Sequence, residues 1–167
     1  ILDFAVSENL ESMFTAVLLN SDEDAVGKMI RDPNASVALS DAGAHLTFFC
    51  DAGFGLHLMG HWARDLGTLT LPEAIHELTA KPAAIYRIPK RGKIEVGYHA
   101  DLLLFDPATV ARGVKRRIHD LPGGEARLTT DAVGIHGTWV NGVQVTNQNG
   151  LIEGDQRPGQ LLREFDT

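Results

Sequence analysis

The residues best suited to chemistry follow a short apolar run. The segment "ASVALS" (35–40) predicts a buried strand, Asp41 comes directly after it, and His45 follows four residues later. In parallel α/β folds, chemistry takes place at the carboxyl ends of the strands, and an unpaired carboxylate is too costly to bury in a core. The residue types leave two interpretations open. Asp41 either caps the following turn, as aspartate often does, or it is a metal ligand or general base.

A strand–helix–strand pattern would position Asp41. Residues 13–20 ("MFTAVLLN") are mostly apolar and favour a second buried strand. The helix expected over residues 21–32 begins with an N-cap pattern, Ser21 followed by Asp24. A strand, a helix and a strand with short connections make a βαβ unit, whose strands are expected to be parallel.

The character of the chain changes near residue 88. Local patterns predict helices at 1–10, 54–66, 71–80 and 82–88, and strands at 93–96, 100–105, 131–140 and 143–147. Thr70 and Glu73 form a capping box, and Asn141-Gly142 is a strong hairpin signal. We therefore divide the chain into an α/β part (1–88) and a β-rich part (89–167).

Composition limits the function classes. The 167 residues are 44% hydrophobic and carry a net charge of −7, so a nucleic-acid partner is not expected. No apolar run approaches the ~20 residues of a membrane span. The one basic cluster, 111–117, is interpreted as a solvated loop. Cys50 is the single cysteine, which fits a reducing compartment and a cytoplasmic location, and we assign it to the core rather than to a nucleophile.

The histidines offer weaker candidates. His57 and His61 are four residues apart on one predicted helix face, which would suit a zinc pair, but no HExxH motif accompanies them. An exposed or partner-covered helix surface is the favoured interpretation. His45 contacts substrate or orients Asp41, or it only caps a turn. No chemistry is assigned to His76, His99, His119 or His136.

Four segments resemble the C-terminal part of the amidohydrolase superfamily, nearest to the N-acyl-D-amino-acid deacylases. They are "LSDAGAH" (39–45), "ELTAKPAAIY" (77–86), "RGKIEVGYHADLLLFDP" (91–107) and "VNGVQV" (140–145). The resemblance implies an α/β fold made of the last βα units of a (β/α)8 barrel, followed by part of a small β-sandwich domain.

The resemblance also implies a chemistry. Such enzymes carry one or two divalent metals, usually zinc, and cleave the amide C–N bond of N-acyl amino acids or similar amides. The last barrel strand ends in an aspartate that binds metal and takes a proton from the attacking water, and Asp41 stands at that position. A zinc-bound water has a pKa of about 7, so a neighbouring carboxylate can accept its proton and return it to the leaving amine. His45 is then a candidate substrate-binding residue.

The family's other metal ligands have no counterpart in the sequence. The chain contains no H-x-H pair, and a catalytic zinc takes about three protein ligands. The alternative function is a catalytically inactive, truncated fragment that acts only as an oligomeric structural domain. Two barrel strands would leave unpaired edges and uncovered apolar helix faces. We therefore expect a homo-oligomer. The expected binding partner is a small N-acyl amino acid or related amide, not a membrane.

Overall fold

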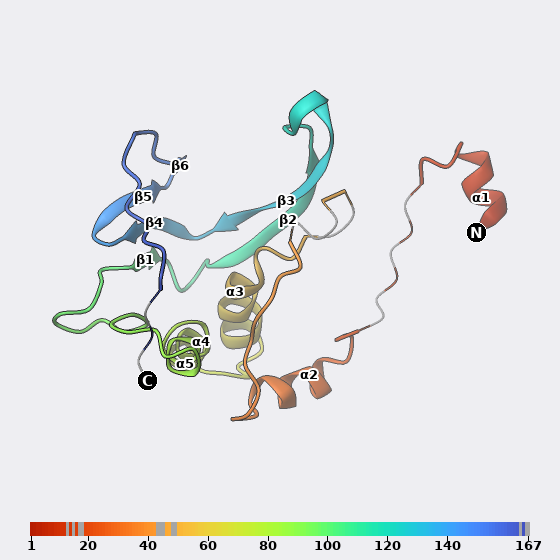
Figure 1. The fold of residues 1–167 in the computed structure, drawn as a ribbon. Coiled ribbons are helices and arrows are strands. Elements are labelled where there is room, and N and C mark those ends of the chain that lie inside the picture. The colour runs from red at the N-terminus through yellow and green to blue at the C-terminus, as the bar shows by residue number, and fades with distance from the viewer. Residues whose placement is uncertain are drawn as a thin grey trace.

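Helices occupy the first half of the protein and small antiparallel sheets the second half (Figure 1). The structure is a computed structural model that describes residues 1–12, 14, 16, 19–42, 46–47, 50–163 and 165. The helices are α1 (Leu2–Ser7), α2 (Glu23–Ile30), α3 (Phe54–His57), the π-helix η1 (Leu58–Asp65), α4 (Leu71–Leu78), α5 (Ala80–Ile85) and the 3-10 helix η2 (Pro122–Gly124). The strands are β1 (Leu102–Phe105), β2 (Ala111–Ile118), β3 (Arg127–Val133), β4 (Ile135–Val140), β5 (Val143–Asn147) and β6 (Gly150–Leu151).

The predicted helices form, because their signals are local. Helix α4 has the expected capping box, in which the Thr70 N–H donates to Glu73 Oε2 (2.7 Å) and the Glu73 N–H donates to Thr70 Oγ1 (3.4 Å). Helix α2 also forms, but its N-cap is Asp22, which accepts from the Ala25 N–H at 3.1 Å. The predicted cap at Ser21 is therefore wrong by one residue. In the part of the chain that the structure describes, every helix is too short or too polar to cross a bilayer.

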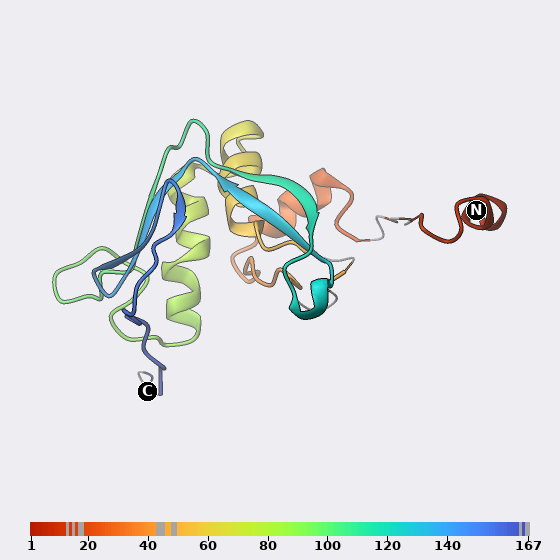
Figure 2. The ribbon, with the colours of Figure 1, turned by 90° about the horizontal axis from the view of Figure 1, so that it is seen from above.

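The core lies between the helices and the start of β2. Helices α3 and η1 form one continuous helix over the predicted range, and α4 and α5 lie beside it (Figure 2). Val110, at the start of β2, is fully buried against this helical layer. The buried cluster consists of Leu58, Met59, Trp62, Ala63, Leu69, Ala74 and Val110. The largest group in this core therefore comes from η1.

The larger sheet has four antiparallel strands in the order β1-β4-β5-β6. The predicted hairpin at Asn141-Gly142 is confirmed: both residues have positive φ (49° and 81°), as a type I′ turn between β4 and β5 requires. The smaller sheet pairs β2 with β3. Since β2 covers residues 111–118, the interpretation of the basic cluster as a loop is wrong. Its charges hide the strand pattern, and Arg116 pairs with Asp131 on β3 at 2.8 Å.

Two predicted strands are not formed. Residues 93–96 are irregular, with Ile94 and Val96 fully exposed, and residues 35–40 have no strand geometry because Leu39 has a φ of +65°. A strand needs a neighbour for its ladder, and neither segment pairs with a described strand. The parallel βαβ unit is therefore wrong for this structure, and no barrel forms among its described strands. The strand expected over 13–20 falls largely outside the described residues.

Gly60 allows η1 to approach β2 closely. A methyl group at Gly60 would overlap the Val110 carbonyl oxygen, which is backbone and cannot move aside. We expect Gly60→Ala to lower the free energy of unfolding by about 1–3 kcal/mol. Gly55→Ala is the matched control, because its methyl would meet Leu78 at an ordinary 3.5 Å. Urea unfolding followed by tryptophan fluorescence measures both variants. Equal stability of the two would contradict the close packing of η1 on β2.

Candidate functional site

Asp41 lies exposed in a turn. Its backbone has a φ of +46°, and the turn is held by the Ser40 hydroxyl, which accepts a hydrogen bond from the Ala42 N–H at 3.2 Å. Among the described residues, none donates a hydrogen bond to the Asp41 carboxylate. Ser40 thus makes a capping contact in this turn, and the two interpretations of Asp41 stay open. His45, the predicted substrate contact, lies outside the described residues.

Two backbone hydrogen bonds fix the segment around Asp41. The Asp51 N–H donates to the Ser40 carbonyl oxygen (3.2 Å), which joins the two ends of the segment that we call the Asp41 loop, whose described residues are 40–42, 46–47 and 50–51. The Leu128 N–H, on β3, donates to the Leu46 carbonyl oxygen (2.8 Å). The described part of this loop therefore runs beside the two-stranded β2–β3 ribbon (Figure 1).

The ribbon also contributes charge to the loop. Asp51 Oδ1 lies 2.6 Å from Lys115 Nζ and 3.2 Å from Arg112 Nη1, and both cations are on β2. Sequence reasoning missed this contact, because Arg112 is 61 residues from Asp51 and was placed in a loop. The signal available was the run of cations itself, whose length fits a strand. Cys50, next to Asp51, is buried as predicted and is a free thiol.

Polar side chains of α2, α3 and η1 lie close together. The rings of His57 and His61 stack with centroids 4.6 Å apart, and His61 Nε2 lies 2.7 Å from Glu23 Oε1. Within the described residues, no group of three or more His, Cys, Asp or Glu side chains could hold a metal ion. The histidine pair on its own does not make a catalytic metal site, which takes about three protein ligands.

His57 should make stability depend on pH. Burial is the main cause that lowers the pKa of His57, and the nearby His61 and Arg112 lower it further. As the pH falls, the unfolded chain therefore binds this proton at a higher pH than the folded protein does. The contribution of neutral His57 to the free energy of unfolding is complete above the ordinary histidine pKa of about 6.5 and decreases below it. We expect the urea midpoint to decrease between about pH 7.5 and pH 5.5. We expect His57→Gln to flatten this decrease.

The control for this prediction is His119→Gln, because His119 is exposed at the far end of β2. The quantity compared is the change of the urea midpoint with pH, so a uniform loss of stability in one variant does not affect the result. A decrease of equal size in the wild type and in His57→Gln would show that His57 is not its source.

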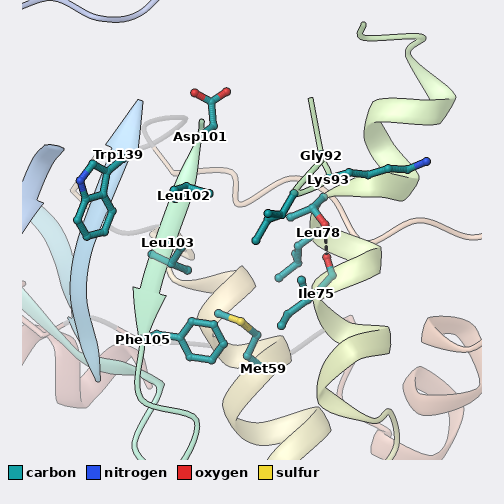
Figure 3. Close-up of a pocket in the computed structure, with 12 residues that line it drawn as sticks. Met59, Ile75, Leu78, Gly92, Lys93, Asp101, Leu102, Leu103, Phe105 and Trp139 are labelled. Carbon is teal, nitrogen blue, oxygen red and sulfur yellow. Dashed lines mark hydrogen bonds between the residues drawn. The ribbon is translucent and has the colours of Figure 1, made fainter. Parts of the chain in front are cut away.

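The apolar cavity of about 520 Å³ between the helices and β1 is a separate feature (Figure 3). Leu103 and Phe105 of β1 face Met59, Ile75 and Leu78 across it. Its charged lining residues are Lys93 and Asp101, and Asp101 is paired with Arg91. The described residues of the Asp41 loop are not part of its lining, which is mostly apolar.

The protein belongs to the Amidohydrolase family, whose model matches residues 8–146. It is 42% identical over 104 residues to an N-acyl-D-aspartate deacylase of Alcaligenes xylosoxydans xylosoxydans, covering 62% of this chain and 19% of the relative. A D-aminoacylase of the same organism is 38% identical over 105 residues, covering 63% and 19% of the two chains. These matches confirm the resemblance found in the sequence.

A solved structure supports the same relationship. N-acyl-D-glutamate deacylase from Bordetella bronchiseptica, complexed with zinc and a phosphonate mimic of the tetrahedral intermediate, matches with a TM-score of 0.65 and 34% identity. The match covers 86% of this chain and 28% of that chain. The protein spans about a fifth of the length of the curated relatives it matches (19%). Its mixed α/β fold therefore corresponds to part of these larger deacylases.

Proposed function

We propose that the protein is the part of a metal-dependent N-acyl-D-amino-acid deacylase that carries the proton-transfer aspartate, Asp41. The observation behind this proposal is that the family match includes Asp41, whose carboxylate is exposed at the end of a closed loop. The chain is similar to deacylases of N-acyl-D-aspartate and N-acyl-D-glutamate, and we propose N-acylated D-amino acids as its substrate class.

The described residues alone do not fit a catalytic zinc. Asp41 is a single carboxylate, and the described part of the chain contains no cluster of three ligands. We propose that the remaining zinc ligands belong to a part of the enzyme outside these 167 residues, as the coverage of the relatives suggests. Residues 1–88 would then be the last βα units of a (β/α)8 barrel, and residues 89–167 part of a small β-sandwich domain.

The contribution of Asp41 is a proton transfer in two directions. A water oxygen bonds to the amide carbon, and the proton that it loses goes to the Asp41 carboxylate. The same proton then passes to the amine nitrogen as the C–N bond breaks, which leaves a carboxylic acid and a free D-amino acid. The second proton of the water stays on the acid product, which loses it to solvent at neutral pH. One protonation cycle of Asp41 therefore balances the hydrolysis, and no other group of this chain needs to change its charge.

A chimera tests the proposal. Residues 8–146 replace the matched segment of N-acyl-D-glutamate deacylase, so the missing strands are supplied by a relative. We expect the purified chimera to hydrolyse N-acyl-D-amino acids in the presence of zinc. A folded, zinc-loaded chimera without this activity would favour the alternative, a catalytically inactive oligomeric domain.

One observation favours that alternative for the isolated chain. Large apolar side chains are exposed on β1 and before it, among them Leu103, Leu104, Ile94 and Val96. Exposed apolar faces of this kind are typical of surfaces that another chain or domain covers. A homo-oligomer therefore stays our prediction for the 167-residue protein.

A further inference from the structure

We propose that the β2–β3 ribbon positions the loop that carries Asp41, and that Asp51 is the positioning residue that joins them. The proposal rests on the proposed function of Asp41, because a loop needs accurate placement only if its carboxylate acts on a substrate. It assigns a role to a pair of strands that lies outside the helical layer.

Asp51 holds the loop with its backbone. Its N–H donates to the carbonyl oxygen of Ser40, the residue immediately before Asp41. Any displacement of Asp51 is therefore passed through one hydrogen bond to the backbone that carries the Asp41 side chain. The second attachment, from the Leu128 N–H to the Leu46 carbonyl oxygen, fixes the other side of the loop to β3.

The carboxylate of Asp51 is held by the ribbon. Lys115 and Arg112 both contact Asp51 Oδ1, at 2.6 Å and 3.2 Å, and the three side chains are only about one-third exposed (39%, 31% and 35%). Gly53 makes room for this arrangement, since a methyl group there would lie 2.9 Å from Arg112 Cδ. The Arg112 stem thus lies against the backbone of Gly53, two residues after Asp51, while its guanidinium reaches Asp51.

The ribbon is itself fixed to the core. Val110, directly before β2, is fully buried, and its carbonyl oxygen accepts a hydrogen bond from Arg64 Nη1 at 2.7 Å. Antiparallel pairing with β3 stiffens the strand beyond that point. A continuous set of contacts therefore runs from η1 through Val110 and β2 to Asp51. This set of contacts fixes where the turn at Asp41 sits relative to the core.

One ion pair of the ribbon joins β2 to β3 and provides a matched control. Asp131 on β3 pairs with Arg116 on β2 at 2.8 Å, with both side chains more than half exposed (62% and 53%). Asp131→Asn therefore removes one carboxylate that pairs with a cation of β2, as Asp51→Asn does, but it changes a residue of β3 and not of the loop.

The test measures amide hydrogen exchange by NMR in the 167-residue protein. We expect Asp51→Asn to speed hydrogen exchange of the backbone amides at positions 42 and 51 about tenfold or more, while the urea midpoint changes little. Asp51→Glu should restore most of the protection, because it keeps the charge. Asp131→Asn should leave both amides unchanged.

Two results would overturn the proposal: unchanged exchange in Asp51→Asn, or equal acceleration in Asp131→Asn. Should Asp51→Asn fail to fold, Arg112→Gln replaces it, since it removes one of the two cations and keeps the stem over Gly53. It should accelerate the same two amides, and no acceleration would reject the proposal. Because no activity is measured, a failed deacylase assay on the chimera would count only against the proposed function.

Discussion

Asp41→Asn is expected to reduce kcat/KM of the chimera for N-acyl-D-amino acids by about 10²–10⁴-fold. Asparagine has nearly the same shape as aspartate, but its amide cannot accept the proton of the attacking water at neutral pH. The loss should therefore appear in kcat at saturating zinc, with the chimera still folded. The rate of amine release at saturating substrate measures it.

Asp24→Asn is the control for this prediction, because Asp24 is an exposed carboxylate in the first turn of α2. Its rate should stay within about twofold of the unchanged chimera, as expected for a surface substitution. Zinc content is measured for each variant, so that a loss of metal is separated from a loss of proton transfer. An Asp41→Asn chimera that keeps full activity would show that another group accepts the proton.

Leu58→Ala should give the second large effect, a loss of about 2–5 kcal/mol in the free energy of unfolding. Leu58 is only 2% exposed and lies in the core between η1 and its neighbours, so the deletion leaves a cavity there. Leu66, directly after the same helix, is 46% exposed. Leu66→Ala should therefore cost well under half as much.

Urea unfolding at neutral pH, with the slope checked for each variant, compares these two leucine substitutions. Both substitutions remove the same side-chain atoms, so the comparison mainly measures the difference in burial between the two positions. Equal losses would mean that the helical layer around η1 is not the main source of stability.

The helices could be predicted because their signals lie within a few residues. The Thr70–Glu73 capping box and the acidic first turn of α2 specify their helices without any distant partner. The hairpin between β4 and β5 is equally local, because Asn141 and Gly142 adopt the positive φ that its turn requires.

The absence of strands at 35–40 and 93–96 could not be predicted, because a strand-like composition does not specify a neighbouring strand. Both runs have the composition of a strand, but a ladder requires a second strand that neither has in the described structure. The opposite error occurred at β2, where a run of cations led to the prediction of a loop although the segment is a strand. The ion pair between Arg116 and Asp131 joins this strand to β3.

The candidate site was predictable only in part. The resemblance singled out Asp41, and its placement in a turn after an apolar run agrees with the structure. Its surroundings depend on contacts between distant segments, such as Asp51 with Arg112 and Leu46 with Leu128. No spacing rule connects residues that far apart, so the role of the ribbon could come only from the structure.

The most direct test of the central claim is stereospecific hydrolysis by the chimera. A racemic N-acyl amino acid is supplied, and the released amino acid is separated into its enantiomers before chelation, after chelation and after zinc is returned. We predict release of the D-enantiomer alone, lost with the metal and restored by zinc. A folded chimera with bound zinc that releases neither enantiomer, or only the L-enantiomer, would contradict the claim that these residues carry the proton-transfer part of a D-specific deacylase.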